Sequence, residues 1–349
     1  NAHGYVKTGK QLDVGHRNAL TMDDEGVLQY DAHVPWEGPF RYFFNRSELM
    51  SPWGAKMWWS YGEISGNAWL ALDGVELANW DHLGLTGVIG HPIVLGNLLI
   101  YASDDSDTGV ATYDISDPTN PVLLDVLKEN IGGYWPEIWG HYLFFPRRGG
   151  VQLVDFSDPS DLRLVEGCNF SLPTDNSYAS FQDDYAFTAR YKIKLPECEV
   201  VLNFDEETNN TSVSQFAEPI GNLVVMGGYG SIDGASVYQG MSIWAHQAEP
   251  DTKGPEVAYH IPRANQNNYP LMAPISILIH ETLKTETMIP GQSIIVRPVG
   301  GSPIDITYQF SMDDVLTIDP VNDLQPNTTY EVILTSDIQD AASNGLIPY

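Results

Sequence analysis

The acidic loop at residues 104–109 has the residue types and spacing that best fit metal binding. It reads Asp-Asp-Ser-Asp-Thr-Gly, so the carboxylates of Asp104, Asp105 and Asp107 fall within four positions. Calcium binds about six to eight hard oxygen atoms, and alternating Asp and Ser residues before a glycine supply several of them in one turn. The loop lacks the distal glutamate of an EF-hand, and a solvated acidic turn without metal is the simpler interpretation. Calcium at these three aspartates is therefore a hypothesis, and no other cofactor is predicted.

The sequence contains none of the short motifs that mark the common hydrolases and nucleotide-binding enzymes. It has no Gly-x-Ser-x-Gly, no His-Glu-x-x-His and no P-loop, and no two of its nine histidines are three or four residues apart. With 46 acidic residues, carboxylate pairs arise by chance, so pairing alone does not indicate a glycosidase. We therefore predict no catalytic or cofactor-binding residue, and the sequence favours a protein without catalysis.

The two cysteines and five Asn-x-Ser/Thr triplets bear on the compartment. Cys168 and Cys198 lack the spacing of a zinc site or a haem-attachment motif. In an oxidising compartment they would form a disulfide between adjacent structural units, and two buried free thiols are the alternative. The triplets are candidate glycosylation sites that favour secretion, and hence the disulfide, although such triplets also arise by chance. They begin at Asn45, Asn169, Asn209, Asn210 and Asn327.

The charge balance excludes several classes of partner. Seventeen basic and 46 acidic residues give a formal charge of −29, and binding to phosphate backbones needs a cationic face. We therefore expect no nucleic acid and no anionic membrane surface as partner. No apolar run approaches the roughly 18–20 residues that cross a bilayer, so membrane insertion is not expected either. The chain starts at Asn1 without a signal peptide, which we interpret as a processed or internal fragment.

A repeated order of short strands and turns indicates the elements that position these residues. Residues 96–127 hold three apolar or alternating runs, separated by Gly, Asp and Pro residues typical of turns. The same order recurs in residues 140–165, where Asp155–Pro159 follows Asp114–Pro118 by 41 positions. A period of about 40–45 residues with three or four strands is typical of a β-propeller blade. Four units are clear and five to seven are expected in total; the clear ones start near Gly96, Gly140, Asp184 and Gly221.

Two of these units carry a family resemblance. A Gly-Asn turn, apolar strands and an Asp-x-Ser-Asp-Pro turn together resemble the LVIVD-type repeat of secreted bacterial and archaeal β-propellers. The match is close at Asp114–Pro121 and Asp155–Pro159, and the resemblance covers roughly residues 90–250. We expect the aspartates of these turns to accept backbone N–H groups, with ligand binding as the less favoured alternative. The resemblance concerns the fold and says little about chemistry.

The last hundred residues have a different spacing of predicted strands. After a polar Pro/Gly linker at residues 249–255, short strands recur every 10 to 15 residues or so, as in a β-sandwich. The segments Gly254–Val257, Leu324–Val332 and Asp337–Gly345 resemble the bacterial Ig-like domain appended to surface-layer and other secreted proteins. The chain stops at Tyr349, before the last strand of that family is complete. The sequence thus predicts an all-β protein with a propeller at 1–250 and an Ig-like β-sandwich at 254–349 that lacks its last strand.

These observations favour a secreted or cell-surface protein with a structural or adhesive function. Its expected partners are other extracellular proteins, copies of itself or glycans, and an incomplete sandwich edge could pair with a neighbouring chain. The alternative is a carbohydrate-active or other hydrolytic propeller enzyme with its site at the channel mouth. In that case the aromatic residues crowded into positions 36–61 would form a sugar-stacking platform, although packing between sheets explains them more simply.

Overall fold

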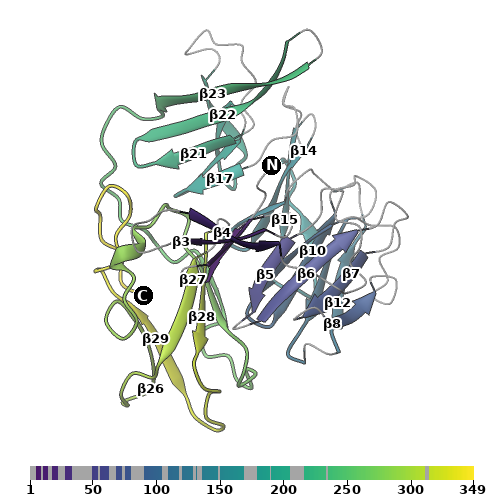
Figure 1. Ribbon diagram of the computed structural model, residues 1–349, viewed down its shortest axis with the longest axis vertical. Coiled ribbons are helices and arrows are strands. Elements are labelled where there is room, and N and C mark those ends of the chain that lie inside the picture. Colours follow the sequence, from purple (N-terminus) through teal and green to yellow (C-terminus); the bar gives the residue numbers. More distant parts are fainter. Residues whose placement is uncertain are drawn as a thin grey trace.

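The computed structural model is built almost wholly of antiparallel β-sheets (Figure 1). The described residues are 5–8, 11–14, 18–22, 28–33, 49–53, 56–62, 68–72, 75–79, 90–103, 109–117, 120–128, 131, 136–147, 150–168, 179–188, 190–204, 216–232, 235–310 and 314–349. No helix among them is long and apolar enough to cross a membrane.

Five four-stranded sheets, in which strands adjacent in sequence are paired, form a five-blade β-propeller arrangement. The first two blades comprise β1 (Tyr5–Thr8), β2 (Gln11–Val14), β3 (Asn18–Met22), β4 (Leu28–His33), β5 (Leu49–Trp53), β6 (Lys56–Gly62), β7 (Ala68–Leu72) and β8 (Val75–Asn79). The third and fourth comprise β9 (Gly90–Leu95), β10 (Leu98–Ser103), β11 (Val110–Asp114), β12 (Val122–Leu127), β13 (Glu137–Trp139), β14 (Tyr142–Arg147), β15 (Gly150–Asp155) and β16 (Arg163–Leu164). The fifth comprises β17 (Ala179–Gln182), β18 (Tyr185–Thr188), β19 (Tyr191–Lys194) and β20 (Glu199–Asn203).

The fourth predicted unit is a three-stranded sheet that follows blade 5. It comprises β21 (Phe216–Ile220), β22 (Leu223–Ile232) and β23 (Ala235–Ala245). The predicted all-β fold is confirmed, and the region before residue 80 supplies two blades beyond the four clear units, in line with the five to seven expected in total. Figure 1 shows the three-stranded sheet and the C-terminal strands at opposite ends of the view.

The described residues of the recurring Asp-x-Ser-Asp-Pro segments, 114–117 and 155–159, form equivalent corners in blades 3 and 4, each at the end of the third strand of its sheet. Asp114 Oδ1 accepts the Ser116 N–H at 2.8 Å, and Asp155 Oδ1 accepts the Ser157 N–H at 2.7 Å. The prediction that these aspartates accept backbone N–H groups is therefore confirmed. The corner of blade 4 also contacts the neighbouring blade, because the Leu162 N–H donates to Asp125 Oδ2 of β12 at 2.8 Å.

Blade faces are buried on both sides, which explains why their inner strands read as nearly continuous apolar runs. Successive side chains of a strand point to opposite faces. On β14, Leu143 and Phe145 lie in a core with blade 3, whereas Phe144 lies in a core with blade 5. There the Phe144 ring meets Phe181 edge-on, with centroids 5.7 Å apart.

The two cysteines form a disulfide between adjacent blades. Cys168 follows β16 of blade 4, and Cys198 lies in the β19–β20 turn of blade 5. Their Cα atoms are 5.3 Å apart, within the usual range for a disulfide, and both side chains are buried in the core between these blades.

A buried pair of basic side chains lies where blade 5 meets the three-stranded sheet. Lys192 Nζ lies 3.1 Å from His246 Nδ1, and His246 Nε2 lies 2.8 Å from the Gly221 carbonyl oxygen. Burial lowers the pKa of His246, and the neighbouring Lys192 ammonium lowers it further, although the hydrogen bond to the Gly221 carbonyl and, less strongly, Asp183 oppose this. The imidazole is therefore neutral, with Nδ1 accepting from lysine and Nε2–H donating to the carbonyl.

We expect this histidine to make folding less stable in acid. Its pKa is lower in the folded than in the unfolded chain, so the unfolded chain binds more protons once the pH falls below about 6.5. Stability should fall by up to about 1.4 kcal/mol for each pH unit of acidification. Urea unfolding between pH 7 and pH 5 should show a steeper loss for the wild type than for His246→Gln. Equal slopes would contradict the prediction.

The C-terminal part is a β-sandwich that follows the predicted linker. One sheet has the order β24 (Tyr259–Ile261), β25 (Ile275–Leu278), β28 (Val315–Pro320), β27 (Ile306–Phe310), and the other pairs β26 (Ile294–Pro298) with β29 (Tyr330–Leu334). A short 3₁₀ helix, η2 (Thr285–Thr287), connects them. Side chains from both sheets share one core, with Ile277 and Leu316 from the first and Val296 and Leu334 from the second. Leu334 also exchanges two backbone hydrogen bonds with Tyr349, at 3.3 and 3.4 Å.

Candidate functional site between the propeller and the C-terminal sandwich

Four hairpin turns of the propeller region share one backbone conformation. Each joins the first two strands of its sheet through two residues, and the first of the two has a positive φ. Such turns suit the twist of antiparallel strands, and the conformation favours Gly or Asp at that position. The four residues are Gly96 (+54°), Gly140 (+57°), Asp183 (+54°) and Gly221 (+60°), within one residue of the predicted unit starts.

Three of these turns bind two residues of the sandwich, Ser276 on β25 and His280 just after it. The Gly96 N–H donates to Ser276 Oγ at 2.8 Å. The Gly140 N–H donates to His280 Nε2 at 2.6 Å, and the Asp183 N–H donates to the His280 carbonyl oxygen at 3.2 Å. Blades 3, 4 and 5 therefore dock one strand of the sandwich with their equivalent turns.

The His280 side chain is a buried wedge, meaning that its ring lies between the propeller blades and the C-terminal sandwich. Its ring stacks on Trp139 of blade 4 at 6.3 Å and meets Phe181 of blade 5 at 5.5 Å. Burial lowers its pKa to about 3, so the imidazole is neutral and Nε2 is free to accept from the Gly140 N–H. Nδ1 then carries the proton and lies 3.5 Å from Asp314 Oδ2.

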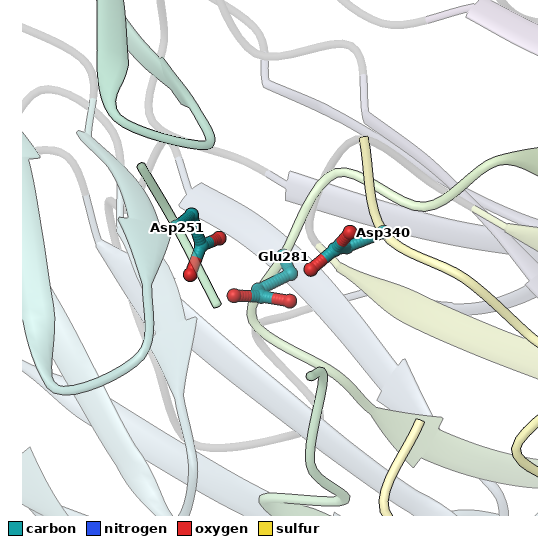
Figure 2. A group of neighbouring side chains, drawn as sticks. All are labelled: Asp251, Glu281 and Asp340. Atoms are coloured by element: carbon teal, nitrogen blue, oxygen red, sulfur yellow. The ribbon is translucent and has the colours of Figure 1, made fainter. Parts of the chain in front are cut away.

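Three carboxylates converge beside this wedge. Asp251 comes from the linker, Glu281 follows β25, and Asp340 comes from the loop after β29. One oxygen from each lies within 4.8 Å of the others, and Figure 2 shows the Glu281 carboxylate between the two aspartates. Three hard oxygen ligands at this separation can hold a hard cation.

Neighbouring groups hold the two aspartates in place. Asp340 accepts the Asn344 N–H at Oδ1 (2.8 Å) and the Asn344 side-chain amide at Oδ2 (2.9 Å). Asp251 accepts the Lys253 N–H at 3.1 Å and the side-chain amide of Gln182, from blade 5, at 3.3 Å. These contacts orient the carboxylates without neutralising their charge.

Glu281 is different, because it is 3% exposed and neither of its carboxylate oxygens has a hydrogen-bond partner among the described residues. Burial raises its pKa to about 9, and the charges of Asp183, Asp340 and Asp251 add to the effect. The Lys253 ammonium pairs with Asp183 at 2.8 Å and with Glu256 at 3.5 Å.

A cavity of about 220 Å³ adjoins this cluster, between the propeller and the sandwich. Glu281 is one of its lining residues. Its other walls include Trp139, His141, Tyr142, Asp183 and Lys253. Carboxylates beside a cavity of this kind suit binding of a cation.

Comparison with known families decides the nature of the sandwich. Residues 251–349 match the family of bacterial Ig-like domains. The C-terminal part is an Ig-like β-sandwich that matches this family. The predicted resemblance is therefore confirmed, and the matched range includes all three residues of the carboxylate cluster. No curated protein matches the chain.

Solved structures align with this chain only at low similarity. BamB from Moraxella catarrhalis aligns with a TM-score of 0.40 and 15% identity, over 89% of this chain and 79% of BamB. PorZ, described as a surface component of the type-IX secretion system of Porphyromonas gingivalis, aligns with a TM-score of 0.45 and 13% identity. That alignment covers 98% of this chain but only 51% of PorZ, so the chain spans about half the length of PorZ.

The sites predicted from sequence and the observed cluster do not coincide. Asp104, Asp105 and Asp107 lie outside the described residues, as do the triplet residues Asn45, Asn169, Asn209 and Asn210. Asn327 lies in an exposed turn of the Ig-like domain. The predicted aromatic platform also falls where no side chains are described. Sequence reasoning missed the cluster, because nothing marks these three residues among the 46 acidic residues of the chain.

The turns at Gly96 and Gly140 offer a matched test of docking. An alanine Cβ at Gly96 would overlap Tyr269 Oη and lie 2.6 Å from Ile261 Cγ2, both in the Ig-like domain, whereas at Gly140 it would meet nothing within 4 Å. Both positions have nearly the same φ, so Gly140→Ala should cost about 1–2 kcal/mol of strain. Gly96→Ala should cost about 1–3 kcal/mol more, from the clash. Urea unfolding measures both losses, and equal losses would contradict docking at Gly96.

Proposed function

We propose that this protein is an extracellular or cell-surface scaffold with a structural or adhesive role. Its propeller, of the LVIVD type, and its Ig-like domain would act as one rigid body. The observation that carries the proposal is the docking of β25 and its extension by the equivalent turns of three successive blades. A rigid joint of this kind presents the remaining loops of both domains at fixed positions.

An extracellular location is supported by the disulfide between blades 4 and 5, since such bonds persist in oxidising compartments. The formal charge of −29 suits a soluble surface and disfavours nucleic acid as a partner. The proposed partners are other extracellular proteins, copies of this chain or glycans.

A glycan array, a hydrolysis screen on the same glycans and sedimentation of the whole chain would test this function together. We expect binding to a glycan or a protein, or self-association, without turnover. Hydrolysis of a glycan that is abolished by a single Asp or Glu substitution at the channel mouth would contradict the proposal and favour the propeller enzyme.

A further inference from the structure

We propose that Asp251, Glu281 and Asp340 bind one calcium ion, which fastens the linker and the Ig-like domain to the propeller. The inference stands on the geometry of the junction and not on the proposed function. The loop at Asp104–Asp107 is a separate hypothesis in another part of the chain.

The unpaired state of Glu281 is the first reason. Leaving a buried polar group without a partner costs about 1–3 kcal/mol, and more for a charged group. Both Glu281 oxygens lack a hydrogen-bond partner among the described residues, and Figure 2 shows the carboxylate pointing into the space between Asp251 and Asp340. A cation there would supply the missing partner for both oxygens.

The second reason is that the other two ligands are already oriented. Asn344 binds both oxygens of Asp340, while Gln182 and the Lys253 N–H bind Asp251. Hydrogen bonds of this kind fix the direction of metal ligands in proteins. Because Gln182 belongs to blade 5, they also connect the cluster directly to the propeller.

The chemistry of the donors selects the ion. All three side chains offer carboxylate oxygens, which suit calcium, magnesium or manganese, whereas zinc prefers nitrogen and sulfur ligands. Calcium–oxygen bonds of about 2.3–2.6 Å place two ligands of one ion at most about 5 Å apart, and the cluster spans 4.8 Å or less. Calcium also accepts irregular geometry and waters from a neighbouring cavity, whereas magnesium requires a near-ideal octahedron.

Thermal unfolding of the whole chain, after treatment with a chelator, tests the site. Calcium at a hundredfold excess over its Kd should raise the Tm by about 5 °C. Magnesium at the same concentration should produce a clearly smaller shift. Equal shifts for the two ions would overturn the choice of calcium.

Two variants locate the ion. Glu281→Gln keeps the side-chain shape but removes the charge, so it should fold, abolish the calcium shift and weaken calcium binding at least tenfold in calorimetry. Asp337→Asn, an exposed residue of the same loop as Asp340, is the matched control and should retain the full shift. The chelated Glu281→Gln protein should melt no lower than the chelated wild type, which shows that loss of the response is not loss of the fold.

A third variant separates this site from the acidic loop. Asp105→Asn should leave the calcium shift unchanged. If instead Asp105→Asn abolishes the shift while Glu281→Gln retains it, the loop binds the ion and the proposal is overturned. The absence of any calcium shift in the wild type would overturn it as well, and would leave Glu281 as a protonated buried acid. Neither result bears on the scaffold function, which the glycan and sedimentation experiments test.

Discussion

Replacing His280 with alanine should lower the free energy of unfolding by about 3–4 kcal/mol and uncouple the Ig-like domain from the propeller. The substitution removes a buried ring from between Trp139 and Phe181 and leaves a cavity. It also leaves the Gly140 N–H without its acceptor. Both of the lost contacts lie between the propeller and the Ig-like domain. Scanning calorimetry should therefore show one transition for the wild type and two for His280→Ala.

His260 offers a matched control for this experiment. It lies on β24 of the same domain, but its contacts, Pro262 and Tyr349, are within the Ig-like domain. His260→Ala should cost about 1 kcal/mol and keep the single transition. If both variants lose the same stability and melt in one step, His280 is not the wedge that joins the domains.

Removing the disulfide should cost about 3–4 kcal/mol. Cys168 and Cys198 are 30 residues apart, and in the chain-entropy model a loop of this length loses about that much conformational freedom in the unfolded chain. The bond also links blades 4 and 5, which are otherwise joined covalently only by the chain segment between β16 and β17. Urea unfolding of the Cys168→Ser/Cys198→Ser variant should show the loss at neutral pH.

A reductant supplies the control for the disulfide. It should lower the urea midpoint of the wild type toward that of the double variant and leave the double variant itself unchanged. A double variant as stable as the oxidised wild type would show that the disulfide does not stabilise the folded protein.

The propeller could be predicted from sequence because its signals are local. A positive φ at the first residue of a two-residue hairpin selects Gly or Asp, and an Asp whose side chain caps a corner selects the Asp-x-Ser-Asp-Pro order. Gly96 and Gly140, like Asp114 and Asp155, therefore recur at the blade period and reveal it. Before residue 90, Gly9 and Gly54 stand in the sequence between the first two strands of their blades, as Gly96 does. No Asp-x-Ser-Asp-Pro order accompanies them, so this region shows no clear repeat.

The junction could not be predicted, because its residues meet only in the folded chain. Asp251, Glu281 and Asp340 are 30 and 59 positions apart, and among 46 acidic residues nothing marks these three. His280 ends an apolar strand, where a packed core histidine is the ordinary expectation, and only the structure shows that it accepts a hydrogen bond from another domain. Nor does a blade's turn motif indicate what binds to that turn.

Hydrogen exchange of the turn amides in the whole chain tests most directly whether the blades dock the Ig-like domain. The N–H groups of Gly96, Gly140 and Asp183 should exchange as slowly as the strand amides of β10 and β14, because each donates to an Ig-like residue. In His280→Ala the Gly140 amide, which loses its side-chain acceptor, should become fast. Rapid exchange of all three amides in the wild type, at the rate of the exposed turn at Asn327, would contradict the docked arrangement.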